Sequence, residues 1–267
     1  MNPLYFGIIS ASTYIGATIY LASQLRHHTE VNKTILIGSG VFAFFFHAVS
    51  AYGVIKTPEG IYFSFFQVAS LFGWVIAAVA IIASFYRPVS NLALLAYPSA
   101  AMGILLSLTI KTDTSPLPAL SPEILLHIIL SILAYSVLAI AVAQSLLLYA
   151  QHYQLKHKHM TGLIQFLPPL QTMEKLLFEM IWAGIALLSI SIGSGFLFLE
   201  NLFSQHLVHK TTLSIAAWLT FAVLLWGRHK LGWRGKTAIK GTLIGFSLLV
   251  LAYFGSKLVL EIILQRS

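Results

Sequence analysis

Two histidines lie inside long apolar segments of this 267-residue chain. His47 stands in the segment FAFFFHAVSAY, and His127 stands in PEILLHIILSILAY. A polar side chain in an apolar segment is costly to place in lipid, so it indicates a functional or interhelical role. A lone imidazole often serves as an interhelical hydrogen-bonding group. Two neutral imidazoles can instead hold a haem iron from both sides, as axial ligands. The sequence leaves both interpretations of His47 and His127 open.

Other residues add to this set of candidates. His206 and His209 lie close together in ENLFSQHLVHK, and Lys257 lies near the end of the last apolar stretch. Lys257 can extend toward the membrane surface or pair with a haem propionate. The chain has no cysteine, which excludes disulfides, thiol relay and Cys-ligated metal centres. No segment resembles a phosphate-binding loop, a zinc-protease motif or a catalytic triad, so we expect no enzymatic activity.

The elements that must position these residues are membrane-spanning helices. Hydrophobic residues make up 58% of the chain and charged residues only 9%, whereas a soluble domain carries about 25% charged residues. A helix needs about 20 mostly apolar residues to cross a bilayer. Eight such stretches are present: Leu4–Leu25, Lys33–Ile55, Phe63–Phe85, Val89–Ile110, Pro122–Ala150, Phe178–Leu199, Lys210–Gly227 and Thr242–Ile263. The predicted fold is all-α, a polytopic bundle of about eight spans, which forms a single integral membrane domain over residues 1–267.

The distribution of positive charge predicts how the bundle is oriented. The connections after the odd-numbered spans hold Arg26, Lys33, Arg87, Lys156, Lys158, Lys175, Arg228, Lys230, Arg234, Lys236 and Lys240. The connections after the even-numbered spans hold only Lys56, Lys111 and Lys210. Because cytoplasmic loops are enriched in Lys and Arg, both termini are predicted to be periplasmic. The net charge of +8 is thus a topology signal that also favours anionic lipids. It does not indicate a nucleic-acid partner.

This orientation brings the two intramembrane histidines to a similar depth. His47 lies more than halfway along a span that runs from inside to outside, and His127 lies one turn into a span that enters from outside. At a rise of about 1.5 Å per residue, both fall in the outer half of the bilayer. The outer-loop histidines His206 and His209 face the same side, which strengthens a ligand role for the group.

The connections show how the spans are separated. Thr112–Pro122 contains three prolines and is predicted to be an outward loop. Gln151–His159 is a basic extension on the cytoplasmic side, and Thr172–Lys175 is predicted to be a short surface helix before the sixth span. The chain has no visible internal repeat, so a transporter built from inverted repeats is not supported.

The second half of the chain resembles a known family. The segments LHIILSILAYSVLAIAVAQSLLLY and GWRGK…GF…YFG are similar to the cytochrome c assembly superfamily, which includes the CcsA/ResC, CcmC and HemX-type haem-handling membrane proteins. The likeness extends to the YpjD-like inner-membrane branch, whose length and eight-span plan this chain shares. The resemblance implies that His127 matches an outward-facing haem ligand. It also implies that His47 falls near a membrane-embedded histidine of the CcsA-like proteins.

The chain also departs from that family pattern. The tryptophan-rich signature expected between the sixth and seventh spans is missing, and the second outward histidine is replaced around Leu260–Ile263. With these differences, the resemblance still implies a haem-binding protein of the bacterial inner membrane that supports cytochrome c assembly or haem trafficking. Its cofactor would be haem b, bound non-covalently by His127 with His47, His206 or His209. Its partners would be lipids, haem and other cytochrome c biogenesis or membrane proteins. The alternative is a non-catalytic scaffold of the same fold that no longer binds haem.

Overall fold

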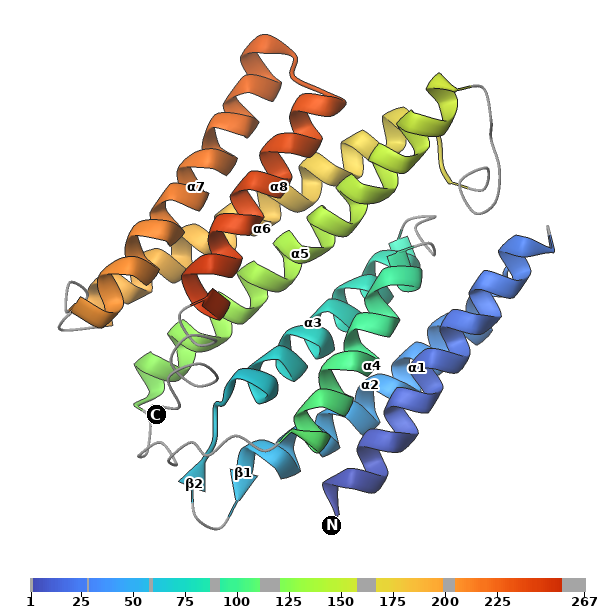
Figure 1. The fold of residues 1–267 in the computed structure, drawn as a ribbon, viewed down its shortest axis with the longest axis vertical. Helices are drawn as coiled ribbons and strands as arrows, with labels where there is room; N and C mark the ends of the chain where they lie inside the picture. Colours follow the sequence, from blue (N-terminus) through green and yellow to red (C-terminus); the bar gives the residue numbers. More distant parts are fainter. Residues whose placement is uncertain are drawn as a thin grey trace. The chain divides into compact units, whose positions relative to one another are not determined.

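The computed structural model of this chain describes residues 2–27, 29–57, 60–86, 92–110, 121–157, 167–198 and 205–255. The described residues are predominantly helical (Figure 1). Their elements are α1 (Pro3–Arg26), α2 (Lys33–Ile55), β1 (Lys56–Thr57), β2 (Gly60–Ile61), α3 (Phe65–Tyr86), α4 (Ala93–Thr109), α5 (Pro122–Lys156), α6 (Leu170–Phe198), α7 (Gln205–Leu231), α8 (Lys236–Val250) and the π-helical turn η3 (Leu251–Gly255).

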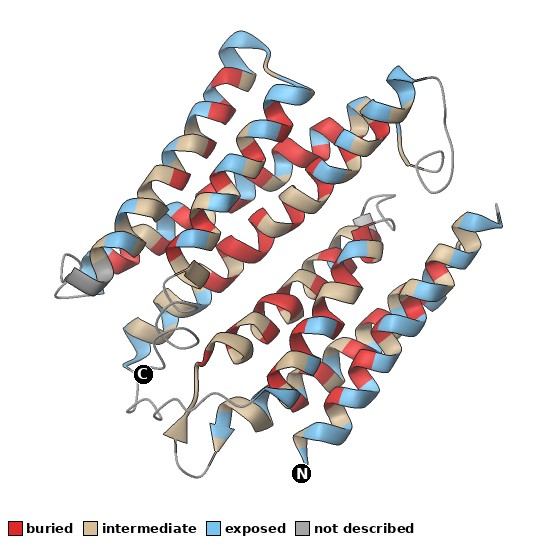
Figure 2. Ribbon diagram, in the orientation of Figure 1, coloured by how far each residue is buried: buried red, intermediate tan, exposed pale blue. Residues whose placement is uncertain are grey.

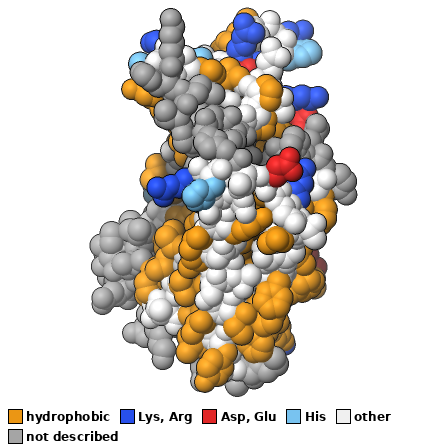
Figure 3. Space-filling view, turned by 90° about the vertical axis from the view of Figure 1, so that its right-hand side faces the viewer, with side chains coloured by type: hydrophobic (Ala, Val, Ile, Leu, Met, Phe, Trp, Pro, Cys, Tyr) orange, Lys and Arg blue, Asp and Glu red, His pale blue; other side chains and the backbone are white. Residues whose placement is uncertain are grey.

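The predicted all-α membrane fold is confirmed. Among the described residues, seven helical segments are long and apolar enough to cross a membrane; the seventh is α8 together with η3, Lys236–Gly255. The helix α4 is a shorter apolar helix of 17 residues. Hydrophobic side chains cover a broad area of the face seen in Figure 3. Large apolar side chains such as Phe45 and Trp182 are each 63% exposed, as expected for positions that contact lipid.

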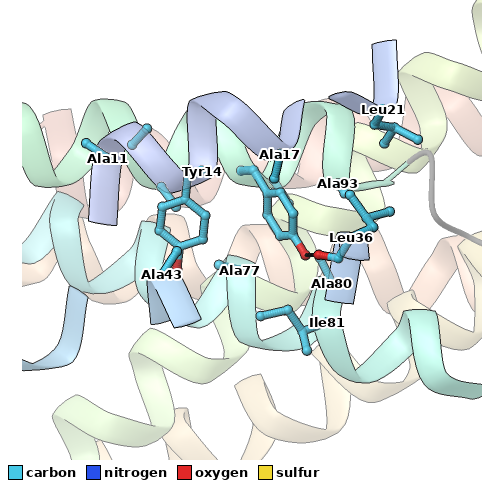
Figure 4. Close-up of a cluster of buried hydrophobic side chains, with 14 of the residues drawn as sticks. Ala11, Tyr14, Ala17, Leu21, Leu36, Ala43, Ala77, Ala80, Ile81 and Ala93 are labelled. Atoms are coloured by element: carbon cyan, nitrogen blue, oxygen red, sulfur yellow. Dashed lines mark hydrogen bonds between the residues drawn. The ribbon is translucent and has the colours of Figure 1, made fainter. Parts of the chain in front are cut away.

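The described helices group into two compact units. The first unit contains α1 to α4, in which α1 contacts α2 and α4, and α3 contacts the same two helices. Its core is made largely of alanines and two tyrosines. Figure 4 shows Tyr14 of α1 beside Ala43 of α2, with Ala77 of α3 nearby. A two-residue antiparallel ladder pairs Lys56 with Ile61 and joins α2 to α3.

The second unit contains α5 to α8 and η3, and it repeats the same order of contacts. Here α5 contacts α6 and α8, and α7 also contacts both. In each unit the buried residues follow the helix sides that face their neighbours (Figure 2). The single integral domain expected from the sequence stays a prediction.

The sixth helix corrects one sequence prediction. Thr172–Lys175 is not a separate surface helix but the first turns of the continuous helix α6. Met173 and Leu177 are completely buried there, and the Gln144 side-chain amide of α5 donates to the Met173 carbonyl at 3.1 Å. Packing against α5 therefore extends the helix beyond its most apolar part, because the buried face continues past the predicted boundary.

The connection between α7 and α8 is held by partly buried polar contacts. The Glu174 carboxylate of α6 accepts a hydrogen bond at 2.7 Å from the backbone N–H of Gly235, a glycine with a positive φ of 56°. The Arg228 guanidinium lies 4.8 Å from the centroid of the Phe178 ring and donates to the Trp233 carbonyl. The GWRGK segment thus forms a turn fixed onto α6.

The predicted orientation can be tested directly, because the chain has no cysteine of its own. We expect Lys230→Cys, at the exposed end of α7, to react with a membrane-impermeant maleimide only after the cytoplasmic side is opened. Glu123→Cys, in the first turn of α5, should react in intact cells whose outer membrane has been permeabilised. The opposite labelling pattern would invert the topology.

Candidate functional site

His127 lies in the second turn of α5 and is half-buried against α6. Its Nδ1 atom lies 3.0 Å from the Ser191 carbonyl oxygen and 3.0 Å from the Ser194 hydroxyl oxygen. Because a carbonyl oxygen can only accept, Nδ1 carries the proton of the neutral imidazole. The lone pair therefore lies on Nε2, for which the described residues provide no hydrogen-bond partner. This tautomer is the one that a metal-binding histidine needs.

A line of serines fixes the position of this imidazole. Ser131, one turn further along α5, donates to the His127 carbonyl at 2.8 Å, and its oxygen lies 2.7 Å from the Ser191 hydroxyl oxygen. Ser194 donates to the Ser191 carbonyl at 2.8 Å. Ser191 and Ser194 are both buried. The α5–α6 interface thus orients His127 through a connected network rather than through a single contact.

Aromatic residues and a lysine also lie on the side of the second unit that carries His127. Tyr135 lies eight residues after His127 on α5 and is buried, so it shares a helix face with His127 and Ser131. Its ring centroid lies 6.2 Å from that of Tyr253 in η3. The Lys210 Nζ of α7 lies 5.9 Å from the centroid of the Tyr253 ring. Contacts therefore connect α5, η3 and α7 on this side.

His47 has a different environment in the first unit. It is completely buried, and its Nε2 lies 2.9 Å from the Ser70 hydroxyl oxygen of α3. Its Nδ1 is buried without a hydrogen-bond partner among the described residues. The ring packs edge-on to Tyr14 of α1, with centroids 6.0 Å apart. This environment matches the interhelical hydrogen-bonding role that the sequence left open, while the ligand role stays a prediction.

The remaining predicted site residues are only partly described. His206 and His209 do not lie in a loop, as the sequence predicted, but belong to α7, where His209 is exposed in the second turn. His206 belongs to the first turn of the same helix, but its side chain lies outside the described part of the chain, as does Lys257 entirely. Within the described ranges, no group of three or more His, Asp or Glu side chains could hold a metal ion.

Sequence reasoning missed the residues that orient His127. Ser191 and Ser194 lie 64 and 67 positions further along the chain, in the segment SISIGSG, whose serines are ordinary in a membrane helix. A signal was nevertheless present for Ser131, which follows His127 by four residues and so lies on the same helix face. The sequence marks Lys210 only as a charge at the beginning of the predicted seventh span.

Comparison with known proteins agrees with the family resemblance. A family model described as cytochrome C assembly protein matches residues 35–264. The inner membrane protein YpjD of Escherichia coli K12 is 39% identical over 143 residues, which cover 54% of this chain and 54% of that protein. An uncharacterized 28.8 kDa protein of Azospirillum brasilense is 35% identical over 141 residues, 52% of each chain. The chain thus spans about half the length of the curated relatives it matches. No solved structure matches. Because the family model covers most of the sequence, this chain belongs to the cytochrome c assembly protein family.

Proposed function

We propose that this chain is a haem-binding, multi-pass protein of the bacterial inner membrane that supports cytochrome c assembly or haem trafficking. Membership of the cytochrome c assembly family supports a role in cytochrome c biogenesis. The name of its Escherichia coli relative supports the inner-membrane location. The observation that carries the haem proposal is the hydrogen bonding of His127, whose Nδ1–H is held by α6 while Nε2 keeps its lone pair.

The residues around His127 fit an axial haem ligand. An axial histidine normally donates its second ring N–H to a carbonyl or carboxylate, which fixes the ring and raises its basicity. The Ser191 carbonyl provides this acceptor here. When bound, haem b would supply an iron centre that accepts the Nε2 lone pair and can be passed on with the macrocycle. The work of this chain is to orient the imidazole and hold the cofactor between apolar helices.

The second axial ligand is proposed from the other histidines. His209 and His206 belong to the beginning of α7, in the same unit as His127, which supports them for this role. His47 belongs to the first unit, where its Nε2 lies 2.9 Å from the Ser70 hydroxyl oxygen and its Nδ1 is buried, so its surroundings support it less for this role. Single replacement of each histidine by alanine, followed by low-temperature electron paramagnetic resonance of the ferric protein, distinguishes these candidates.

The proposal is tested by titrating the purified full-length protein in detergent with hemin. We expect saturable one-to-one uptake, a Soret band shifted from that of free hemin, and distinct α and β bands after reduction. Protein purified from cells supplied with a haem precursor should already be coloured. A colourless protein that takes up no hemin above the level of empty detergent micelles rejects the proposal. The non-catalytic scaffold of the same fold then remains, to be tested by co-purification of a stoichiometric membrane partner.

A further inference from the structure

We propose that Lys210 binds a propionate carboxylate of the haem held at His127. This inference rests on the proposed function and adds to it the group that recognises the acidic edge of the macrocycle. Nothing in the family comparison assigns a role to Lys210. Two features support this role: the distribution of charges in the second unit, and the ring contacts that connect Lys210 to the helix of His127.

The charges of the second unit are strongly sorted along its helices. The described cations near the end of α5, the start of α6, the end of α7 and the start of α8 are Lys156, Lys175, Arg228, Lys230, Arg234, Lys236 and Lys240. These four helix ends lie together because successive helices alternate in direction. Among the described residues of this unit, Lys210 is the one Lys or Arg toward the opposite ends, where α5 begins and α6 finishes. His127, Ser191 and Ser194 belong to those ends.

A chain of contacts leads from Lys210 to the α5 face that carries His127. The Lys210 Nζ lies 5.9 Å from the centroid of the Tyr253 ring, and that ring packs nearly edge-on to Tyr135, with centroids 6.2 Å apart. Tyr135 follows His127 by eight residues on one face of α5, a separation of about 12 Å along the helix axis. The ammonium group is thus held by an aromatic ring that contacts the same helix face as the imidazole.

These groups match the chemistry of haem. Haem is a flat apolar macrocycle with two carboxylates on one edge, so its site needs a ligand for the iron, apolar and aromatic walls, and a cation. A lysine near a helix end can bury its aliphatic chain and present the ammonium at the membrane surface. Glu123, the described acid at this end of α5, is exposed in the first helical turn. A carboxylate in a partly desolvated site gains a charge-assisted hydrogen bond from the lysine.

Hemin and its dimethyl ester separate the role of the carboxylates from that of the iron. We expect Lys210→Met to weaken hemin binding about 10-fold, the effect of losing one hydrogen bond to a charged group, and to leave dimethyl ester binding unchanged. Lys210→Arg should restore most of the hemin affinity. Lys230→Met, which removes an exposed cation at the opposite helix ends, is the matched control and should behave as wild type. Both ligands are titrated into full-length protein in detergent and followed by Soret absorbance.

The outcomes separate the two proposals. The role of Lys210 is overturned, while haem binding stands, if the wild-type protein binds hemin and Lys210→Met binds it with unchanged affinity. The same conclusion follows if Lys210→Met lowers the affinity for hemin and for the dimethyl ester equally. If the wild-type protein binds neither ligand, haem binding itself fails, and the role of Lys210 fails with it. Size-exclusion elution identical to wild type shows that a weakened variant is folded.

Discussion

Replacing His127 by leucine should lower hemin affinity by more than about 100-fold, beyond the 10–100-fold typical of losing a residue that only supports a metal ligand. The expected cause is the loss of the Nε2 lone pair, which no other described side chain of the α5–α6 interface provides. Leucine preserves the apolar volume at a half-buried position, so the helix packing should persist. The measurement is a hemin titration of the purified protein, followed by its Soret absorbance.

Two further variants serve as comparisons for His127→Leu. Ser194→Ala removes one of the two acceptors of the Nδ1 proton but leaves the Ser191 carbonyl in place. It should therefore lower hemin affinity less than His127→Leu does, by about 10-fold or below. His229→Leu removes an exposed histidine near the other end of α7 and should bind hemin as the wild type does. Retention of wild-type affinity and spectrum by His127→Leu would contradict the ligand role.

Replacing Gly73 by leucine should unfold the first unit at a markedly lower temperature. A Cβ at Gly73 of α3 would lie 2.9 Å from the Ala100 Cα of α4, and a Cβ at Gly103 of α4 would lie 3.2 Å from the Ser70 Cα of α3. These are backbone contacts, so a larger side chain must push the two helices apart. Small residues that allow such close approach are the usual basis of helix packing in membranes.

The expected cost of Gly73→Leu is about 3 kcal/mol, the upper range for overpacking a well-packed interface. The measurement is the thermal unfolding midpoint of the purified protein in detergent. Gly38→Leu is the matched control, because no atom lies within 4 Å of a Cβ at that exposed position of α2. Equal midpoints for the two variants would show that the α3–α4 contact contributes little. Since α3 also carries Ser70, the contact positions the hydrogen-bond partner of His47.

The sequence by itself determined the membrane class and the bounds of the first three helices to within two residues. Length and hydropathy are local properties, so the span Lys33–Ile55 was predicted with the same limits that the structure has. The family likewise followed from contiguous segments. Local pattern was less reliable where tertiary packing extends a helix, as in α6, whose first turns are fixed by Gln144 of α5 and by the α7–α8 connection.

Only the tertiary structure decided the environments of the two intramembrane histidines. Both looked alike in sequence, as single imidazoles in apolar segments. The structure buries His47 completely beside Ser70 and Tyr14. It leaves His127 half-buried, with its proton directed to Ser191 and Ser194. Which nitrogen of an imidazole keeps its lone pair depends on the partner of the other nitrogen, and here that partner comes from another helix more than sixty residues away. Helical periodicity carries no information about such a contact.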